Sequence, residues 1–319
     1  MNFGWNKRER LTSRATGGPE KAAIEIEGRE VSLTNLDRVL FPESGFTKGD
    51  LIDYYAAVAP ALLPHLRDRP VTMRRFPDGV EGEGFWEKHC PTYRPRWVKT
   101  ASIVSESSAQ GEVDYCLVND LPTLVWMANL ACIELHVSLA KARRRKTPDF
   151  MVFDLDPGKP ADILDCAEVA LLIRDTLKGQ GLDSLAKVSG SKGIQVYVPL
   201  NRRARYERTG EFAHSLARAF EEEMPDQVVS KMRKSLRKGK VLIDWSQNTE
   251  HKTTVAVYSM RAKSTPSVSM PVGWKLLERA LDGSDRNLLH FDHVSVLRQL
   301  KRGEDRFAPV LTEQQTLPT

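Results

Sequence analysis

The chain has 319 residues, 41% of them hydrophobic, which suits a folded protein of about two domains and excludes wholesale disorder. Its 47 Lys and Arg against 42 Asp and Glu give a net charge of +5, which permits a nucleic-acid-binding face without identifying one. The four cysteines form no CxxC pair, so we expect reduced, buried thiols rather than a zinc ribbon. No apolar run reaches the ~20 residues of a membrane helix, and the N-terminus lacks the apolar stretch of a secretory signal. The sequence therefore predicts a soluble, cytoplasmic protein.

Strands and helices alternate along the whole sequence. Residues 1–20 are polar, which is typical of a flexible arm. Thr47 is a suitable N-cap for the first helix, because Asp50 at its third position completes a weaker form of the capping box. The apolar patterns predict, in chain order, a strand at 22–28, a helix at 47–66, a buried helix from 121 that ends as a strand near 133–139, a strand at 150–156, a helix at 162–178, strands at 185–190 and 194–200, a helix at 207–223, strands at 241–247 and 253–261, and a helix at 290–302. This alternation predicts a mixed α/β or α+β protein.

Two aspartates lie two residues apart in the apolar segment 150–156. Side chains alternate between the faces of a strand, so Asp154 and Asp156 share one face, with their Cα atoms roughly 6.5 Å apart. Both carboxylates can then reach a pair of divalent ions about 3.5–4 Å apart, as phosphoryl-transfer enzymes require. Asp244 lies in a second apolar segment, where a buried acid without a partner is costly and a metal would remove the cost. We expect the three acids to form a two-metal site, although solvated acids at a strand end give the same local pattern.

Glycines, hydroxyls and a cation meet in the predicted turn at residues 189–193. Its glycines let backbone N–H groups converge, and Ser189, Ser191 and Lys192 add donors and a positive charge, so the turn suits a triphosphate. It is not a Walker A motif, because the residue order differs and a strand follows it. The same composition also occurs in ordinary turns.

Basic residues gather in two runs, 141–146 and 231–240. Each run leads into a strand that carries a proposed metal ligand. Such runs are often solvated surface, but here they would place positive charge where phosphates lie.

Phe85 and Trp86 form an aromatic pair in a polar, glycine-bearing segment. Adjacent residues of a strand face opposite ways, so one ring can be buried while the other stacks on a base. Core packing of both rings is the alternative.

The order of these motifs resembles the polymerase domain of bacterial ligase D, within the archaeo-eukaryotic primase superfamily. The resemblance runs from about Val31 to Leu300 and rests on LTNLDRVLFP, FWEK, VFDLDPG, SGSKG, KSLRKGKVLIDWSQN and KTTVAVYSMR. It implies an α+β, primase-like catalytic core of two packed sheets flanked by helices. The core would form a single polymerase domain at 21–305, with subdomains of about 21–140 and 141–305, followed by a C-terminal tail at 306–319. The resemblance also implies a template-dependent nucleotidyltransferase that uses two divalent ions, Mn²⁺ or Mg²⁺.

Residue by residue, the resemblance implies three groups of site residues. The catalytic, metal-binding carboxylates would be Asp154, Asp156 and Asp244. The incoming nucleotide would be bound by His136, Ser189, Ser191, Lys192, Arg237, Gln247 and Arg261. DNA would be held by Asn35, Arg38 and Lys48, which form a pocket for a downstream 5′-phosphate, and by Phe85 and Trp86, which stack on the template.

Two positions depart from the family pattern. Arg38 stands where Lys is usual and would bind phosphate with a planar fork. Gln195 stands where the family usually has His, and its amide does not accept a proton at neutral pH. A KxDG ligase motif is absent from the sequence, so we expect a stand-alone polymerase.

The most direct interpretation is an enzyme that fills short gaps or repairs ends on 5′-phosphorylated DNA. Its substrates would be nucleoside triphosphates and gapped or broken DNA, and a separate ligase or other repair proteins would be its partners at the nucleoid. Three alternatives remain open at this point: a primase that starts chains de novo, a two-metal nuclease, and a non-catalytic module that binds DNA ends.

Overall fold

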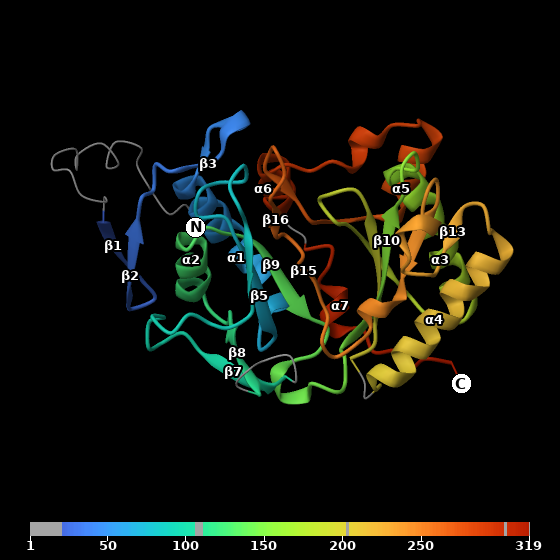
Figure 1. The fold of residues 1–319 in the computed structure, drawn as a ribbon, viewed down its shortest axis with the longest axis horizontal. Helices are drawn as coiled ribbons and strands as arrows, with labels where there is room; N and C mark the ends of the chain where they lie inside the picture. Colours follow the sequence, from blue (N-terminus) through green and yellow to red (C-terminus); the bar gives the residue numbers. More distant parts are fainter. Residues whose placement is uncertain (1–20, 106–110, 202–203, 303–304, 319) are drawn as a thin grey trace.

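Residues 21–105, 111–201, 204–302 and 305–318 are described by a computed structural model (Figure 1). The predicted N-terminal arm lies outside these residues. The helices are α1 (Lys48–Leu66), α2 (Leu121–Asn129), α3 (Ile163–Gly179), α4 (Tyr206–Glu223), α5 (Trp274–Asp282), α6 (His293–Leu300) and α7 (Pro309–Thr312). In the described part of the chain, none of them is both long and apolar enough to span a membrane.

One sheet carries the segment with the two aspartates near its centre. Its strands, in spatial order, are β13 (Val228–Val229), β14 (Val241–Asp244), β10 (Phe150–Pro157), β12 (Ile194–Pro199), β11 (Leu185–Val188) and β18 (Met270–Val272). All neighbours are antiparallel except β13 and β14. Helix α3 contacts β10 and β12, and α4 contacts β10 and β13, so both helices lie beside this sheet (Figure 1).

A second sheet carries the aromatic pair at one edge. Its spatial order is β15 (Thr253–Val255), β9 (Cys132–Ser138), β5 (Pro70–Arg75), β8 (Glu112–Leu117) and β7 (Thr100–Val104), and β6 (Phe85–Glu87) pairs with the end of β5. The strands β1 (Lys21–Ile26) and β2 (Arg29–Thr34) form a hairpin, and β3 (Val39–Phe41) pairs with β4 (Phe46–Thr47). Helices α1 and α2 pack against each other on this side of the molecule (Figure 1).

The segment from β15 to β18 joins the two sheets. It follows β14 of the first sheet, pairs with β9 of the second through β15, and returns to the first sheet through β18. Between them, β16 (Met260–Arg261) pairs with β17 (Ser267–Val268). This path brings side chains of β9, β10 and β16 toward one region between the sheets.

The mixed α+β class is confirmed, and so are the main predicted helices. The capping box of α1 is present, since Thr47 Oγ1 accepts a hydrogen bond from the Asp50 backbone N–H and the Asp50 side chain accepts one from the Thr47 N–H. Helices α3, α4 and α6 begin within a few residues of their predicted positions. The residues predicted as a C-terminal tail contain α7 and bury Phe307 and Val310.

The predicted strand at 253–261 is wrong in its extent. The chain leaves β15 after Val255 and turns, with Tyr258 in the left-handed region at φ 61° and the Ser259 N–H bonded to the carbonyl of Ala256. It resumes as β16 at Met260. A strand cannot continue through a residue with positive φ, which the apolar composition of this segment does not reveal.

The expectation of four reduced thiols is also wrong. Cys90 and Cys116 form a disulfide, with their Cα atoms 5.0 Å apart, whereas Cys132 and Cys166 are free and buried. The segment after β6 lies beside β8 because the Cys90 N–H bonds to the carbonyl of Asp114. This proximity of residues distant in sequence cannot be obtained from cysteine spacing.

Candidate active site

The three predicted metal-binding acids lie on two neighbouring strands. Asp154 and Asp156 are the partly exposed positions of β10, separated by the fully buried Leu155, as the alternation predicts. Asp244 ends β14 directly opposite Asp154 in the antiparallel register. The structure therefore brings the three acids together at one end of β10.

Burial and like charge act against ionisation of Asp154, whereas Asp244 has Lys252 Nζ at 3.9 Å from its Oδ2. Burial, followed by the negative charges of Asp156 and Asp244, raises the pKa of Asp154 to about 7. A hydrogen bond from Gln195, its partner on β12, acts in the opposite direction. Each carboxylate oxygen of Asp244 accepts a hydrogen bond, Oδ1 from the Ser246 N–H at 3.0 Å and Oδ2 from Gln247 Nε2 at 2.9 Å.

The three acids have suitable ligand atoms for a divalent cation, but their side chains are not arranged around a common point. Among the described residues, no three or more His, Cys, Asp or Glu side chains are grouped tightly enough to hold a metal ion. Carboxylate oxygens are nevertheless the ligands that Mg²⁺ and Mn²⁺ prefer. A cation bound by Asp154 and Asp156 would also offset the like-charge repulsion that raises the pKa of Asp154.

The Ser/Gly/Lys turn between β11 and β12 lies against β10. A Cβ at Gly193 would be 2.0 Å from the Leu155 carbonyl oxygen and 3.5 Å from Asp156 Oδ1, so only glycine permits this approach. The Ser189 hydroxyl accepts hydrogen bonds from the N–H groups of Ser191 at 3.3 Å and Gly193 at 3.2 Å. Lys192 Nζ donates to the carbonyl of Pro157 at 3.3 Å. The turn and the acids therefore belong to one site.

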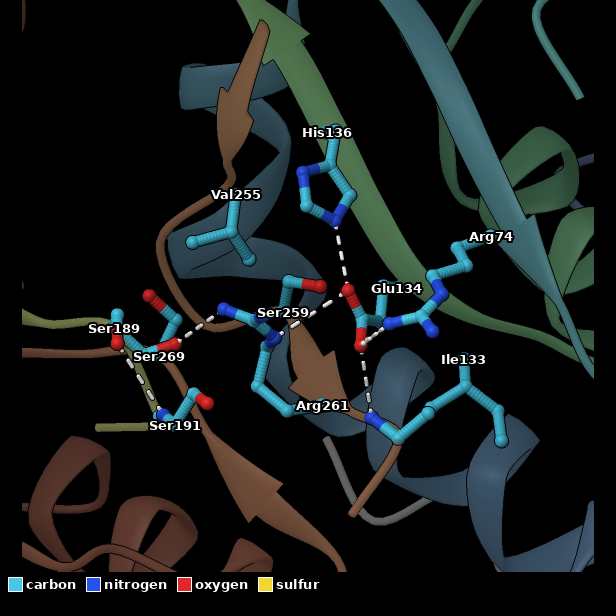
Figure 2. Close-up of polar contacts among 12 residues, drawn as sticks. Arg74, Ile133, Glu134, His136, Ser189, Ser191, Val255, Ser259, Arg261 and Ser269 are labelled. Atoms are coloured by element: carbon cyan, nitrogen blue, oxygen red, sulfur yellow. Dashed lines mark hydrogen bonds and ion pairs between the residues drawn. The ribbon is translucent and has the colours of Figure 1, made fainter. Parts of the chain in front are cut away.

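Arg261 and His136 meet at a buried glutamate on the other side of the site. Arg261 donates through Nη1 to the carbonyl of Ser189 at 2.7 Å, and its Nε lies 3.3 Å from Glu134 Oε2. His136 Nε2 lies 2.8 Å from the same Glu134 oxygen. Figure 2 shows this chain of contacts from Ser191 through Ser189 and Arg261 to Glu134.

One basic run borders the acids and the other does not. Gly158, directly after β10, packs so closely on residues 231–240 that a Cβ there would be 1.8 Å from the Arg237 carbonyl oxygen. The run at 141–146 instead enters the opposite end of β10, about 13 Å along the strand from Asp154. Its Arg144 also pairs with Asp149 at 2.8 Å, so the interpretation of both runs as neighbours of the acids is wrong for 141–146.

Both rings of the aromatic pair are exposed, Phe85 by 42% and Trp86 by 53%, so neither alternative with a buried ring is correct. The reason is that β6 is a short strand paired only with β5 among the described residues, so neither ring is fully covered. Arginines of β5 lie over the rings, Arg75 over Phe85 at 5.2 Å and Arg74 over Trp86 at 5.3 Å from the ring centroid.

The three residues of the predicted phosphate pocket are brought together by backbone hydrogen bonds. Asn35 has φ 50°, its carbonyl accepts from the Arg38 N–H at 3.1 Å, and the Arg38 carbonyl accepts from the Lys48 N–H at 2.8 Å. Lys48 Nζ donates to Thr34 Oγ1 and to the carbonyl of Asn129. Burial, and then the charge of Arg38, lowers the pKa of Lys48 to about 8.

Sequence reasoning did not identify two buried charged residues of the site, Glu134 and Lys187. Glu134 has no exposed surface on β9, and Lys187 has none on β11. Lys187 Nζ donates to the carbonyl of Val255 and to Ser269 Oγ. Both residues are single charges inside apolar segments, which is the signal that did identify Asp244.

A fold of two sheets with paired acids, a phosphate-type turn and converging cations defines a nucleotidyltransferase of the primase-polymerase type. The comparisons with known proteins agree. The sequence model of the LigD primase-polymerase domain matches residues 47–307. The chain belongs to the LigD primase-polymerase domain family.

Curated relatives and a solved structure support this membership. The chain is 37% identical over 285 residues to the "Multifunctional non-homologous end joining DNA repair protein LigD" of Mycobacterium tuberculosis, covering 87% of this chain and 36% of that protein. It is 32% identical over 253 residues to the "Bifunctional non-homologous end joining protein LigD" of Bacillus subtilis, covering 79% and 40%. The structure "Polymerase Domain from Mycobacterium tuberculosis Ligase D in complex with DNA" matches with a TM-score of 0.81 and 35% identity, covering 89% of this chain and 99% of that one. The chain thus spans little more than a third of the length of its curated relatives.

Proposed function

We propose that the protein extends DNA strands across short gaps and at broken ends, with a role in end joining. The observation that supports this proposal is the approach of the Ser/Gly/Lys turn to β10, where Gly193 lies beside Asp156 and Lys192 donates to the carbonyl of Pro157. A nucleotide held on that turn has its phosphates next to the acids. The names of the relatives, and the complex with DNA of the similar Mycobacterium tuberculosis polymerase domain, support DNA ends as the substrate.

The acids and the turn have separate tasks in this reaction. Asp154, Asp156 and Asp244 would hold two divalent ions, Mn²⁺ or Mg²⁺, which lower the pKa of the primer 3′-OH and stabilise the leaving pyrophosphate. Ser189, Ser191 and Lys192 would bind the triphosphate through backbone N–H groups, hydroxyls and one cation. Gln247, which donates to Asp244 Oδ2, would orient that carboxylate and contact the nucleotide. Arg237, on the basic run clamped to the end of β10, would add positive charge there.

The DNA would be held at two further places. Arg38 and the buried Lys48 would bind a downstream 5′-phosphate, with Asn35 shaping the turn that leads to Arg38. Phe85 and Trp86 would stack on template bases, because both rings are exposed and backed by arginines.

Primer extension across a gap of defined length tests this proposal. Wild-type protein should extend the primer with Mn²⁺ or Mg²⁺ and should prefer a 5′-phosphorylated downstream strand. The double substitution Asp154→Ala with Asp156→Ala should remove extension by about a thousandfold or more, since it removes the metal ligands. Degradation of the same substrate would indicate the nuclease, and dinucleotide synthesis without a primer would indicate the primase. Binding without any reaction would indicate the end-binding module.

A further inference from the structure

Glu134 is a fully buried acid whose carboxylate is completely surrounded by donors. Its Oε1 accepts hydrogen bonds from Arg74 Nη1 at 3.1 Å and from the Ala262 N–H at 3.0 Å. Its Oε2 lies 2.8 Å from His136 Nε2 and 3.3 Å from Arg261 Nε. The partners come from β5, β9, β16 and the residue after β16, so one carboxylate joins three strands (Figure 2). We call Glu134, Arg74, His136 and Arg261 the Glu134 cluster.

The carboxylate in this cluster is held as an anion. Burial alone would raise the pKa of Glu134, but the hydrogen bond from His136 and the charge of Arg261 outweigh it and lower the pKa to about 2. A permanent anion in a buried position needs all of its donors, because each lost hydrogen bond leaves a desolvated charge.

The anion fixes the orientation of His136. A carboxylate only accepts hydrogen bonds, so the Nε2 of His136 must carry the proton that is donated to Glu134. The Trp86 ring meets the His136 ring edge to face, with 4.7 Å between the centroids. The ring therefore has one fixed tautomer and is packed in place.

The same anion fixes one side of Arg261. The guanidinium faces Glu134 through Nε and the Ser189 carbonyl through Nη1, so it spans the distance between the cluster and the Ser/Gly/Lys turn. Loss of the Glu134 charge would free this arginine to change its orientation.

We propose that Glu134 is a positioning residue that fixes His136 and Arg261, the two side chains predicted above to bind the incoming nucleotide in the proposed function. The inference rests on that function and deepens it, because it assigns nucleotide affinity to a residue that cannot itself touch the nucleotide. A glutamine at this position keeps the size of the side chain but turns an NH₂ group toward either Arg74 and Ala262 or His136 and Arg261, all of which are donors. The nucleotide-binding side chains would then lose their common anchor.

Steady-state extension of a single-nucleotide gap, with the nucleoside triphosphate varied and the DNA saturating, tests the inference. Glu134→Gln should raise the KM for the nucleotide by about tenfold to a hundredfold, as expected for a lost charged hydrogen bond, and should lower kcat less. Glu134→Asp, which keeps the charge on a shorter side chain, should lie between Glu134→Gln and wild type. It provides the same comparison if the glutamine variant does not fold.

Asp305→Asn is the matched control. Asp305 is also a carboxylate bonded to a histidine, a second side chain and a backbone N–H, namely His65 Nε2 at 2.7 Å, Tyr258 and Phe307, but it lies outside the proposed nucleotide site. Asp305→Asn should lower the unfolding temperature and leave the KM for the nucleotide unchanged. An unchanged KM in folded Glu134→Gln or Glu134→Asp, with an active wild type, would overturn this inference alone. A wild type that neither binds nor incorporates nucleotides would overturn the proposed function and this inference together.

Discussion

Two acids in the two sheets have opposite surroundings. Glu134 on β9 accepts hydrogen bonds from three groups and forms an ion pair with Arg261, and its pKa is lowered to about 2. Asp154 on β10 meets two further carboxylates, and its pKa is raised to about 7. Glu134 is fully buried and Asp154 is partly exposed, but burial raises the pKa of both, so the opposite directions come from the neighbouring charges and hydrogen bonds.

The difference distinguishes Glu134, whose charge is neutralised by protein side chains, from Asp154, whose like-charged neighbours favour the binding of a cation. All charge around Glu134 is balanced by the protein itself, so its task is to hold neighbouring side chains. Around Asp154 the charge of Lys187, and Lys252 at 3.9 Å from Asp244 Oδ2, offset part of the negative charge of the three acids, and a bound divalent cation would offset the rest. Two buried lysines are bonded alike, since Lys187 and Lys48 each donate to one hydroxyl and one backbone carbonyl, but Lys48 belongs to the predicted phosphate pocket.

The largest expected effect is that of Asp154→Asn, which should abolish activity without lowering stability. Asp154→Asn should reduce gap extension by about a thousandfold or more, because it removes a metal ligand. It should not lower the unfolding temperature of the metal-free protein, because it also removes a carboxylate that is destabilised by burial and like charge. Extension assays and thermal unfolding in EDTA measure the two effects, with Glu168→Gln on the exposed side of α3 as the control for loss of one negative charge.

Glu134→Gln should have the opposite pattern, with a large loss of stability and a smaller loss of activity. Removing one partner of a buried, fully bonded charge cluster should lower the free energy of unfolding by about 3 kcal/mol. Extension should still be measurable at high nucleotide concentration, since no metal ligand is lost. If Glu134→Gln were as stable as wild type in urea titrations, the contrast between the two acids would be wrong.

Lys48→Met tests whether a buried lysine that already has protein partners also binds the downstream 5′-phosphate. The variant should lose about tenfold of the stimulation of extension by a downstream 5′-phosphate, because a charge-assisted hydrogen bond is removed. The exposed Lys275→Met on α5 is the matched control and should keep the full stimulation. Equal stimulation in both variants would exclude Lys48 from the phosphate pocket.

The smallest effect is a pH dependence of that stimulation. Because the pKa of Lys48 is lowered to about 8, its ammonium group loses its proton within an accessible range, and the neutral amine binds phosphate weakly. Stimulation by the 5′-phosphate should therefore decline as the pH rises through about 8 in wild type. Lys48→Met should show a flat profile, and a similar decline in both proteins would assign the effect to another group.

Much of the architecture could be predicted from local patterns. Alternation placed Asp154 and Asp156 on one face of β10, and Thr47 and Asp50 marked the start of α1. These features depend on neighbours within a few residues, so the sequence contains all of the physics that determines them.

Features that depend on distant neighbours could not be predicted in the same way. The bond between Cys90 and Cys116, the exposure of Phe85 on β6 and the donors around Glu134 all arise from strand pairing across the sheets. Residue type suggests that a buried Glu needs partners, but only the register of β5, β9 and β16 shows that it has them.

In the proposed function, the acids at the end of β10 bind a divalent cation. Thermal unfolding of wild type and of Asp154→Asn with Asp156→Asn, measured with increasing Mn²⁺, tests it most directly. Mn²⁺ should raise the unfolding temperature of wild type, since a ligand that binds the native state stabilises it, and should leave that of the double variant unchanged. An equal rise in both proteins, or none in wild type, would contradict it.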